Sequence, residues 1–309
     1  MGKRHAAVGR RRMHHRDLKK CYAPEHFSIT DNPEETLLFF DQVYNYLRQE
    51  YSVSLQLESV RIITSDAILY MLSLLDMFKN RQGVRFMGNA PVDERCRHIF
   101  MESGFYEYVD SKYSPSRNVK DILAVRSENR VVGRIAQEVV EFAHDKVSPQ
   151  TAVLVWRKVY TTILECMGNT REHAYTGREK YQTKWWLMAL HDESKKRVTF
   201  SILDNGAGIP KTVKKKIMER FWTDDSELIL SALRGEFRTR MNELWRGKGL
   251  PKIFKTYEAG IIQNLAIISN KGYVNYGSNQ FRDLKQKFFG TLVSWTISEG
   301  EYNAQNFNR

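Results

Sequence analysis

The sequence lacks a long apolar run: no stretch approaches the roughly twenty residues that a membrane-spanning helix needs. It also lacks the pattern of a secretory signal peptide. Cysteine is scarce, and the cysteines are scattered without the spacing of a metal site. We therefore expect no membrane span and a reducing, cytoplasmic setting. The three cysteines are Cys21, Cys96 and Cys166.

The familiar phosphate-binding patterns are missing from the glycine-rich loop that begins at Gly247. No Ser or Thr follows Lys248, so this loop is not a P-loop, and it does not have the G-x-G-x-x-G spacing of dinucleotide-binding folds. No zinc-finger or helix-turn-helix pattern is evident in the chain. An anion-binding role for this loop must therefore be considered together with other segments of the chain.

The first of these segments is a predicted helix that carries an acid and an amide. Glu165 and Asn169 stand four residues apart in a stretch with helical apolar spacing, so their side chains share one face. A carboxylate can orient or deprotonate an attacking water. An amide oxygen suits Mg²⁺, which takes few protein ligands. Such a pair is also common on solvated helix faces, so its meaning depends on the other segments.

The second segment is a predicted strand that ends in an acid and a glycine turn. Strand-forming residues 198–203 lead to Asp204, and Gly206 and Gly208 then permit unusual dihedral angles and a close approach to a ligand. A carboxylate at this position can accept a hydrogen bond from a base amine such as that of adenine. An ordinary turn after a strand is the alternative.

The third segment is the loop at Gly247, which opens a predicted helix. Free backbone N–H groups at a helix start attract anions, and Lys248 adds a cation. A flexible linker is the alternative for this loop taken alone. The three segments together make ATP the first ligand to consider.

The order and spacing of these segments resemble the GHKL ATPase superfamily, which includes gyrase, Hsp-type chaperones, histidine kinases and mismatch-repair ATPases. The resemblance covers about residues 130 to 298 and implies a two-layer sandwich of mixed sheet and helices that binds ATP and Mg²⁺. It makes Glu165 the general base, Asn169 the Mg²⁺ ligand and Asp204 the acid that specifies adenine. It assigns the remaining nucleotide contacts to Gly206, Gly208, Gly247, Gly249, Leu250 and Thr291, with Lys248 as an added cation.

The subgroup affects the expected chemistry. Histidine kinases usually carry Asn at the position of Glu165, which argues against that class. The string Glu-x-x-x-Asn-x-x-x-His-Ala-Tyr175 is more similar to the anti-sigma-factor serine kinases and to hydrolytic members that also use Glu. Residues 211–246 occupy the position of the family's ATP lid, for which we expect few buried contacts.

The upstream half alternates predicted strands and helices and so suggests a small α/β unit. It resembles, more loosely, the STAS domain of anti-anti-sigma factors. Ser65 or Thr64 falls at the position of the phosphate acceptor in that family. Asp66 and Ala67 stand where a Gly is usual, and a plain helix cap by Ser65 or Thr64 is the favoured alternative.

Length and composition fit two modest domains in an α/β (α+β) protein. We expect a basic flexible arm over 1–30, a STAS-like α/β domain over 31–113, a linker over 114–129 and a GHKL ATP-binding domain over 130–309. Residues 1–20 carry eight basic residues against Asp17 alone, or +7 of the net charge of +12. Such an arm can bind nucleic acid, an anionic surface or an acidic partner, and a solubilising tail is the alternative.

Two functions follow from this reading. The first is an ATP-dependent regulatory switch with slow ATP hydrolysis or serine-kinase activity. The second is a non-catalytic regulatory or interaction subunit of a bacterial stress or defence system, with an arm that contacts nucleic acid. A protein partner is expected in either case, and a homodimer stays open because dimers are common in the family.

Overall fold

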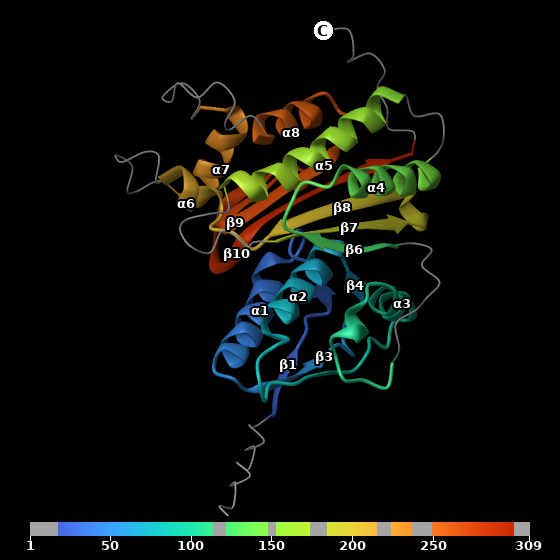
Figure 1. Ribbon diagram of the computed structural model, residues 1–309, viewed down its shortest axis with the longest axis vertical. Coiled ribbons are helices and arrows are strands. Elements are labelled where there is room, and N and C mark those ends of the chain that lie inside the picture. The colour runs from blue at the N-terminus through green and yellow to red at the C-terminus, as the bar shows by residue number, and fades with distance from the viewer. Residues whose placement is uncertain are drawn as a thin grey trace, which may run out of the picture.

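The structure, a computed structural model, describes residues 18–113, 122–147, 153–173, 184–214, 224–236 and 249–299. Helices and strands are mixed along the chain, which confirms the α+β class. Figure 1 shows two parts stacked on each other. We call residues 18–113 the N-terminal unit and residues 122–299 the C-terminal unit. None of the helices in the described ranges is long and apolar enough to cross a membrane.

The C-terminal unit is built on a five-stranded sheet in the order β6-β7-β8-β10-β9. Neighbouring strands are all antiparallel. The sheet twists beneath a layer of helices, and β10 lies between β8 and β9 (Figure 1). The strands are β6 (Ile122–Glu128), β7 (Trp185–Asp192), β8 (Arg197–Asp204), β9 (Gln263–Asn275) and β10 (Gln280–Ser298).

One face of this sheet is covered by helices whose apolar residues repeat at helical spacing. In α5, Val155, Val159, Ile163 and Met167 follow at intervals of four and are fully buried against the sheet. The opposite side of α5 is therefore turned away from the core. The helices of this unit are α4 (Gly133–Lys146), α5 (Val153–His173), α6 (Ile209–Lys214), α7 (Asp225–Arg234) and α8 (Gly249–Glu258), with a short turn, η3 (Glu193–Lys195), between β7 and β8.

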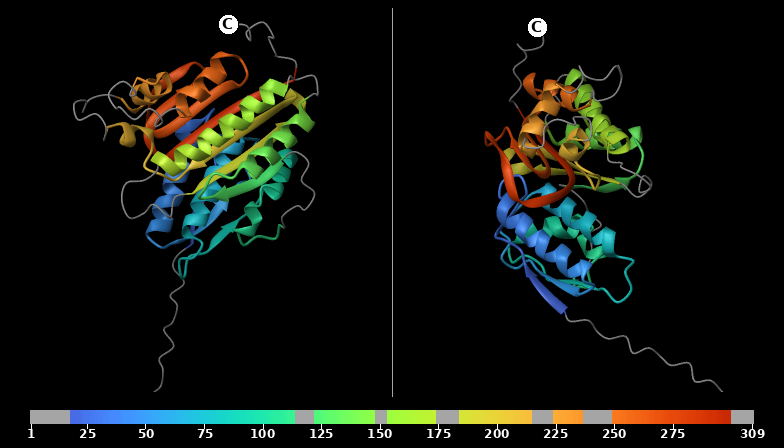
Figure 2. Two further views of the ribbon diagram at one scale, coloured as in Figure 1. Left: turned by 45° about the horizontal axis from the view of Figure 1, so that its top comes forward. Right: turned by 90° about the vertical axis from the view of Figure 1, so that its left-hand side faces the viewer.

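The N-terminal unit contains a parallel three-stranded sheet in the order β1-β3-β5. A second, parallel pair joins β2 to β4. Figure 2 shows α1 and α2 between this sheet and the C-terminal unit. The elements are β1 (Leu18–Tyr22), β2 (His26–Phe27), α1 (Pro33–Arg48), β3 (Ser52–Gln56), β4 (Ile62–Ile63), α2 (Ser65–Phe78), β5 (Phe86–Gly88), α3 (Glu94–Glu102) and η1 (Phe105–Glu107).

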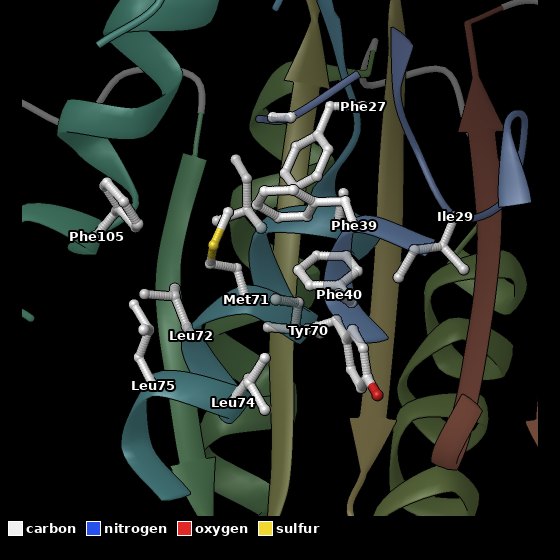
Figure 3. Packing of buried hydrophobic residues seen from close by; sticks show 14 of the residues in the cluster. Phe27, Ile29, Phe39, Phe40, Tyr70, Met71, Leu72, Leu74, Leu75 and Phe105 are labelled. Carbon is white, nitrogen blue, oxygen red and sulfur yellow. The ribbon is translucent and has the colours of Figure 1, made fainter. Parts of the chain in front are cut away.

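The two units share one continuous apolar core. Side chains of α1 and α2 pack on the face of the five-stranded sheet that the other helices leave uncovered, as Figure 3 shows for Phe40 and Tyr70. The ring of Tyr70 stacks on that of Phe288 in β10, with 4.5 Å between the centroids. Phe40 contacts Tyr70 edge to face at 4.8 Å. The N-terminal unit therefore forms a layer of the same core.

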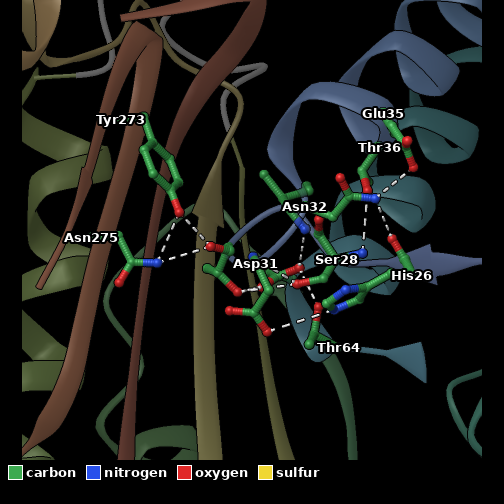
Figure 4. A network of polar contacts seen from close by, with 12 residues as sticks. His26, Ser28, Asp31, Asn32, Glu35, Thr36, Thr64, Tyr273 and Asn275 are labelled. Atoms are coloured by element: carbon green, nitrogen blue, oxygen red, sulfur yellow. Dashed lines mark hydrogen bonds and ion pairs between the residues drawn. The ribbon is translucent and has the colours of Figure 1, made fainter. Parts of the chain in front are cut away.

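Polar contacts also cross this junction (Figure 4). Tyr273 and Asn275 of β9 both donate to the carbonyl oxygen of Thr30, at 2.6 and 2.9 Å. The Thr30 hydroxyl donates to the buried Asp66 carboxylate, which also accepts from the Ile29 N–H. Burial raises the pKa of Asp66 despite these donors. The loop after β2 is thus tied to both units.

Neither Ser65 nor Thr64 fits the two sequence interpretations, which were a phosphate acceptor and a side-chain helix cap. Ser65 is fully buried, and its hydroxyl lies 2.8 Å from that of Ser201 in β8, so it faces the junction between the units and is not accessible as a phosphate acceptor. Thr64 precedes α2 at the cap position, yet its hydroxyl donates to Asp66 and accepts no helix N–H. The prediction of a side-chain cap for this helix is therefore wrong.

Two expected boundaries are corrected. The arm was expected over 1–30, but β1 pairs with β3, so residues 18–30 belong to the folded N-terminal unit. The linker was expected over 114–129, but residues 122–128 form β6 and pair with β7 at the edge of the large sheet. In both cases a short run of polar and apolar residues finds its partner strand far away in the sequence, which local patterning does not reveal.

Candidate functional site

The face of α5 that is turned away from the core carries Glu165 and Asn169. Both side chains are partly exposed, while Cys166 and Met167 between them are buried. This arrangement confirms that the acid and the amide share one face of a helix. Their separation by one helical turn leaves both oxygen-bearing groups at the same rim of the C-terminal unit.

The start of α8 lies directly against this face. A Cβ atom on Gly249 would lie 2.6 Å from Asn169 Oδ1, so any larger residue here would have to displace the Asn169 side chain. One turn into α8, the ammonium group of Lys252 donates to Glu165 Oε1 and forms an ion pair with it. Leu250 at the same end of α8 is partly buried against the core. Helices α5 and α8 thus present a carboxylate, an amide oxygen and a helix start together.

A second group of predicted residues meets at the end of β8. Asp204 pairs with Thr291 of β10, and its Oδ1 accepts the Gly206 N–H at 2.8 Å. The turn continues through Gly208, which adopts a φ of +86° that favours glycine. The sequence thus correctly predicted an acid at the end of a strand followed by a tight turn.

Sequence reasoning missed the residue that holds this turn in place. The hydroxyl of the buried Ser269 in β9 accepts the Ile209 N–H and donates to the Gly290 carbonyl oxygen, each at 2.9 Å. It also lies 3.2 Å from the Thr291 hydroxyl. Nothing local in the sequence distinguishes Ser269 from other strand residues.

Gly290 is the second residue that sequence reasoning did not single out. It has a φ of +102°, and a Cβ atom there would lie 1.8 Å from the Asp204 carbonyl oxygen. The Phe-Gly-Thr string at 289–291 carries the only local signal, since a glycine inside a strand often marks a close backbone approach. Gly290 lets β10 approach the end of β8 beside Asp204.

Electrostatics link the two halves of the site. Burial raises the pKa of Asp204 to about 7, although the N–H groups of Gly206 and Thr291 act in the opposite direction. Burial also raises the pKa of the Cys166 thiol, and the negative charges of Glu165 and Asp204 add to that rise. Both carboxylates are therefore close enough to the same buried thiol to raise its pKa.

The donor set of the site favours some ligands over others. Within the described ranges there is no cluster of three or more His, Cys, Asp or Glu side chains that could hold a metal by themselves. A single amide oxygen and a nearby carboxylate fit Mg²⁺, which keeps waters and takes phosphate oxygens from its substrate. They do not fit zinc, whose protein sites combine three or four Cys, His, Asp or Glu ligands.

Two predicted phosphate contacts and part of the lid lie outside the residues that the structure describes. Gly247 and Lys248 precede the described start of α8, and residues 215–223 and 237–246 of the lid are not described. The expectation of few buried contacts is wrong for 225–234. There α7 buries Ile229 and Leu233, and Asp283 accepts the N–H groups of Asp225 and Ser226.

Comparison with known proteins assigns this chain to no family. No protein-family model matches the sequence, and no curated protein matches it significantly.

Proposed function

We propose that the C-terminal unit binds ATP together with Mg²⁺, as the GHKL resemblance implies. The observation that supports this most is the meeting of Glu165, Asn169 and the start of α8 on one rim, with Asp204 close to the same α5 segment. Segments about forty residues apart thereby contribute to one surface. That surface combines oxygen ligands for a cation with N–H groups for an anion.

Each side chain has a role under this proposal. Asn169 Oδ1 holds Mg²⁺, and bound Mg²⁺ would neutralise phosphate charge and polarise a phosphoryl oxygen. The first turn of α8, from Gly249, offers N–H groups to the phosphates. Asp204 accepts a hydrogen bond from the adenine amine, and Thr291 beside it contacts the base through water.

Glu165 is the proposed general base. Its carboxylate is partly exposed and so can reach a water or a protein hydroxyl that attacks the terminal phosphate. Attack by water gives slow ATP hydrolysis, and attack by a hydroxyl gives protein serine-kinase activity. The proposed enzyme class is therefore an ATPase or a serine kinase.

Calorimetry with ATP, in the presence and absence of Mg²⁺, tests the binding proposal. We expect Mg²⁺-dependent ATP binding by the wild type and a loss of at least about tenfold in affinity for Gly249→Ala, because the new methyl displaces Asn169. Gly168→Ala is the matched control, since a Cβ atom at this position in α5 meets nothing within 4 Å. Absence of ATP binding by the wild type would end the proposal.

Product analysis tests the catalytic part. ADP release and protein phosphorylation are measured for the wild type and for Glu165→Ala, and at least one of them is expected to fall by about 100-fold or more in the variant. If neither product depends on Glu165, the general-base role is wrong while ATP binding stands.

A non-catalytic regulatory function is the second candidate, and the shared core of the two units favours it. A nucleotide bound at the rim of the C-terminal unit lies on the same sheet that the N-terminal unit covers. The parallel strands and helices of the N-terminal unit support a STAS-like partner-binding role in a cytoplasmic, bacterial regulatory system. Nucleotide turnover that stays absent with a co-purified protein partner present would favour this function over the enzyme.

The basic segment 1–20 supports a contact with nucleic acid in either case. Binding to DNA or RNA that weakens steeply with salt and disappears on removal of residues 1–17 is the expected result. Light scattering on the same samples tests whether the chain forms a homodimer.

A further inference from the structure

None of the roles proposed so far accounts for the ion pair between Lys252 and Glu165. Lys252 lies one turn into α8, and its side chain is 52% exposed, whereas that of Glu165 is 23% exposed. The pair therefore bridges α5 and α8 at the surface of the candidate site. It engages one oxygen of the carboxylate that is the proposed general base.

Distance limits what Lys252 can contact when a nucleotide is bound. A base that orients the attacking water lies one hydrogen bond from that water, and the water lies about 3 Å from the terminal phosphorus. A cation that touches this base is thus within a small side-chain movement of the terminal phosphate. The earlier phosphates lie further along the nucleotide, away from the attacking water.

We propose that Lys252 is the residue by which this site distinguishes a nucleoside triphosphate from a diphosphate. This inference rests on the proposed ATP site and adds to it a specificity-determining residue. Without the terminal phosphate, the Lys252 ammonium stays on Glu165 Oε1. With it, the ammonium moves to the phosphate, which carries more charge, and Glu165 Oε1 becomes free to orient a water.

The chemistry of the lysine side chain fits this exchange. Its ammonium group is a compact charge on a flexible stem, and it can change partners by bond rotation alone. The Glu165 carboxylate gains in the same step, because an oxygen that accepts from lysine cannot also accept from water along the same direction. Lys252 therefore couples recognition of the terminal phosphate to release of the base.

The test compares ATP and ADP binding by the full chain with Mg²⁺ present, measured by calorimetry. For Lys252→Met we expect ATP affinity to fall about 10- to 100-fold and ADP affinity to change by less than about twofold. Lys255→Met is the matched control, since it removes an exposed charge from the same helix one turn after Lys252. Lys252→Arg, which keeps the charge, is expected to recover most of the preference for ATP.

Glu165→Gln supplies a second readout. Removing the competing carboxylate frees Lys252, so ATP affinity is expected to rise about threefold or more while ADP affinity stays the same. In the double variant Glu165→Gln/Lys252→Met this gain disappears. A merely structural ion pair would not change the ratio of ATP to ADP affinity.

The outcomes separate the inference from the function on which it rests. If the wild type binds ATP and Lys252→Met keeps the wild-type ratio of ATP to ADP affinity, the role of Lys252 is wrong and the ATP site stands. Equal weakening of both nucleotides overturns the role as well. If the wild type binds neither nucleotide, both proposals fall.

Discussion

The two faces of the five-stranded sheet differ in how they treat polar groups. On the face beneath α1 and α2, the polar groups are buried and partnered, as in the contact of Ser65 with Ser201 and the donors around Asp66. On the opposite face, beneath the helices of the C-terminal unit, the polar groups lie at the rim and keep some exposure, as Glu165 and Asn169 do.

This difference separates a permanent interface from a candidate binding site. Buried polar groups that satisfy one another specify how two surfaces fit, and they leave nothing to offer a ligand. Partly exposed acids and amides contribute less to folding and remain available for a ligand. The junction should therefore govern stability, and the rim should govern binding.

The largest expected effect comes from breaking the junction. Phe40→Ala removes a ring that is 2% exposed and contacts Phe27, Phe39 and Tyr70, so the free energy of unfolding should fall by about 3–5 kcal/mol. Leu38→Ala on the exposed side of the same helix should change it by less than about 0.5 kcal/mol. Denaturant unfolding measures both.

A single unfolding transition is also expected for the wild type, because the two units share one core. Two separate transitions would show that the N-terminal unit is an independent domain that merely rests on the sheet. A loss below about 1 kcal/mol for Phe40→Ala would contradict the packing of its ring in the core.

The second effect concerns Asp204 and depends on pH. Its pKa rises from an ordinary 3.8 to about 7 in the folded chain, so the folded state binds the extra proton in that range. The stability that Asp204 contributes is therefore complete below pH 4 and is lost as the pH rises to about 7. Relative to Asp204→Asn, the wild type should lose as much as about 4 kcal/mol across this window.

The affinity for adenosine should depend on pH in the opposite direction to stability. The ionised Asp204 is the better acceptor for an adenine amine, so adenosine affinity should increase from pH 5.5 to 8 in the wild type and stay flat in Asp204→Asn. Adenosine is used because it has no phosphate that titrates in this range. Parallel profiles for the two proteins would remove Asp204 from the site.

The smallest expected effect concerns a single hydroxyl group at the junction, that of Ser65. Ser65→Ala removes the contact with Ser201, which retains Ser294 as a partner at 3.3 Å, so stability should fall by about 1 kcal/mol. Nucleotide binding should be unchanged. Mass spectrometry should detect no phosphate on Ser65 after incubation with ATP, and stoichiometric phosphorylation there would contradict its burial.

The elements that were predicted correctly are those with strong local patterns. The apolar spacing around Glu165 predicted α5, and the strand-forming run before Asp204 predicted β8. The acid, the glycine turn and the paired acid and amide were readable because each lies within one element. Ser269, Gly290 and Lys252 were not, because their importance comes from contacts with residues that are 21 to 87 positions away, from that of Ser269 with Gly290 to that of Lys252 with Glu165.

The amino-acid sequence by itself determined the helix around Glu165, the strand before Asp204, the glycine turn after it and the residue types available for chemistry, because short-range periodicity and glycine turns depend only on neighbouring residues. Only the tertiary structure decided that β1 and β6 are paired strands, that Ser65 is buried under the sheet and that Lys252 meets Glu165. Those outcomes depend on which surfaces bury the most apolar area together, and that is a property of the whole chain.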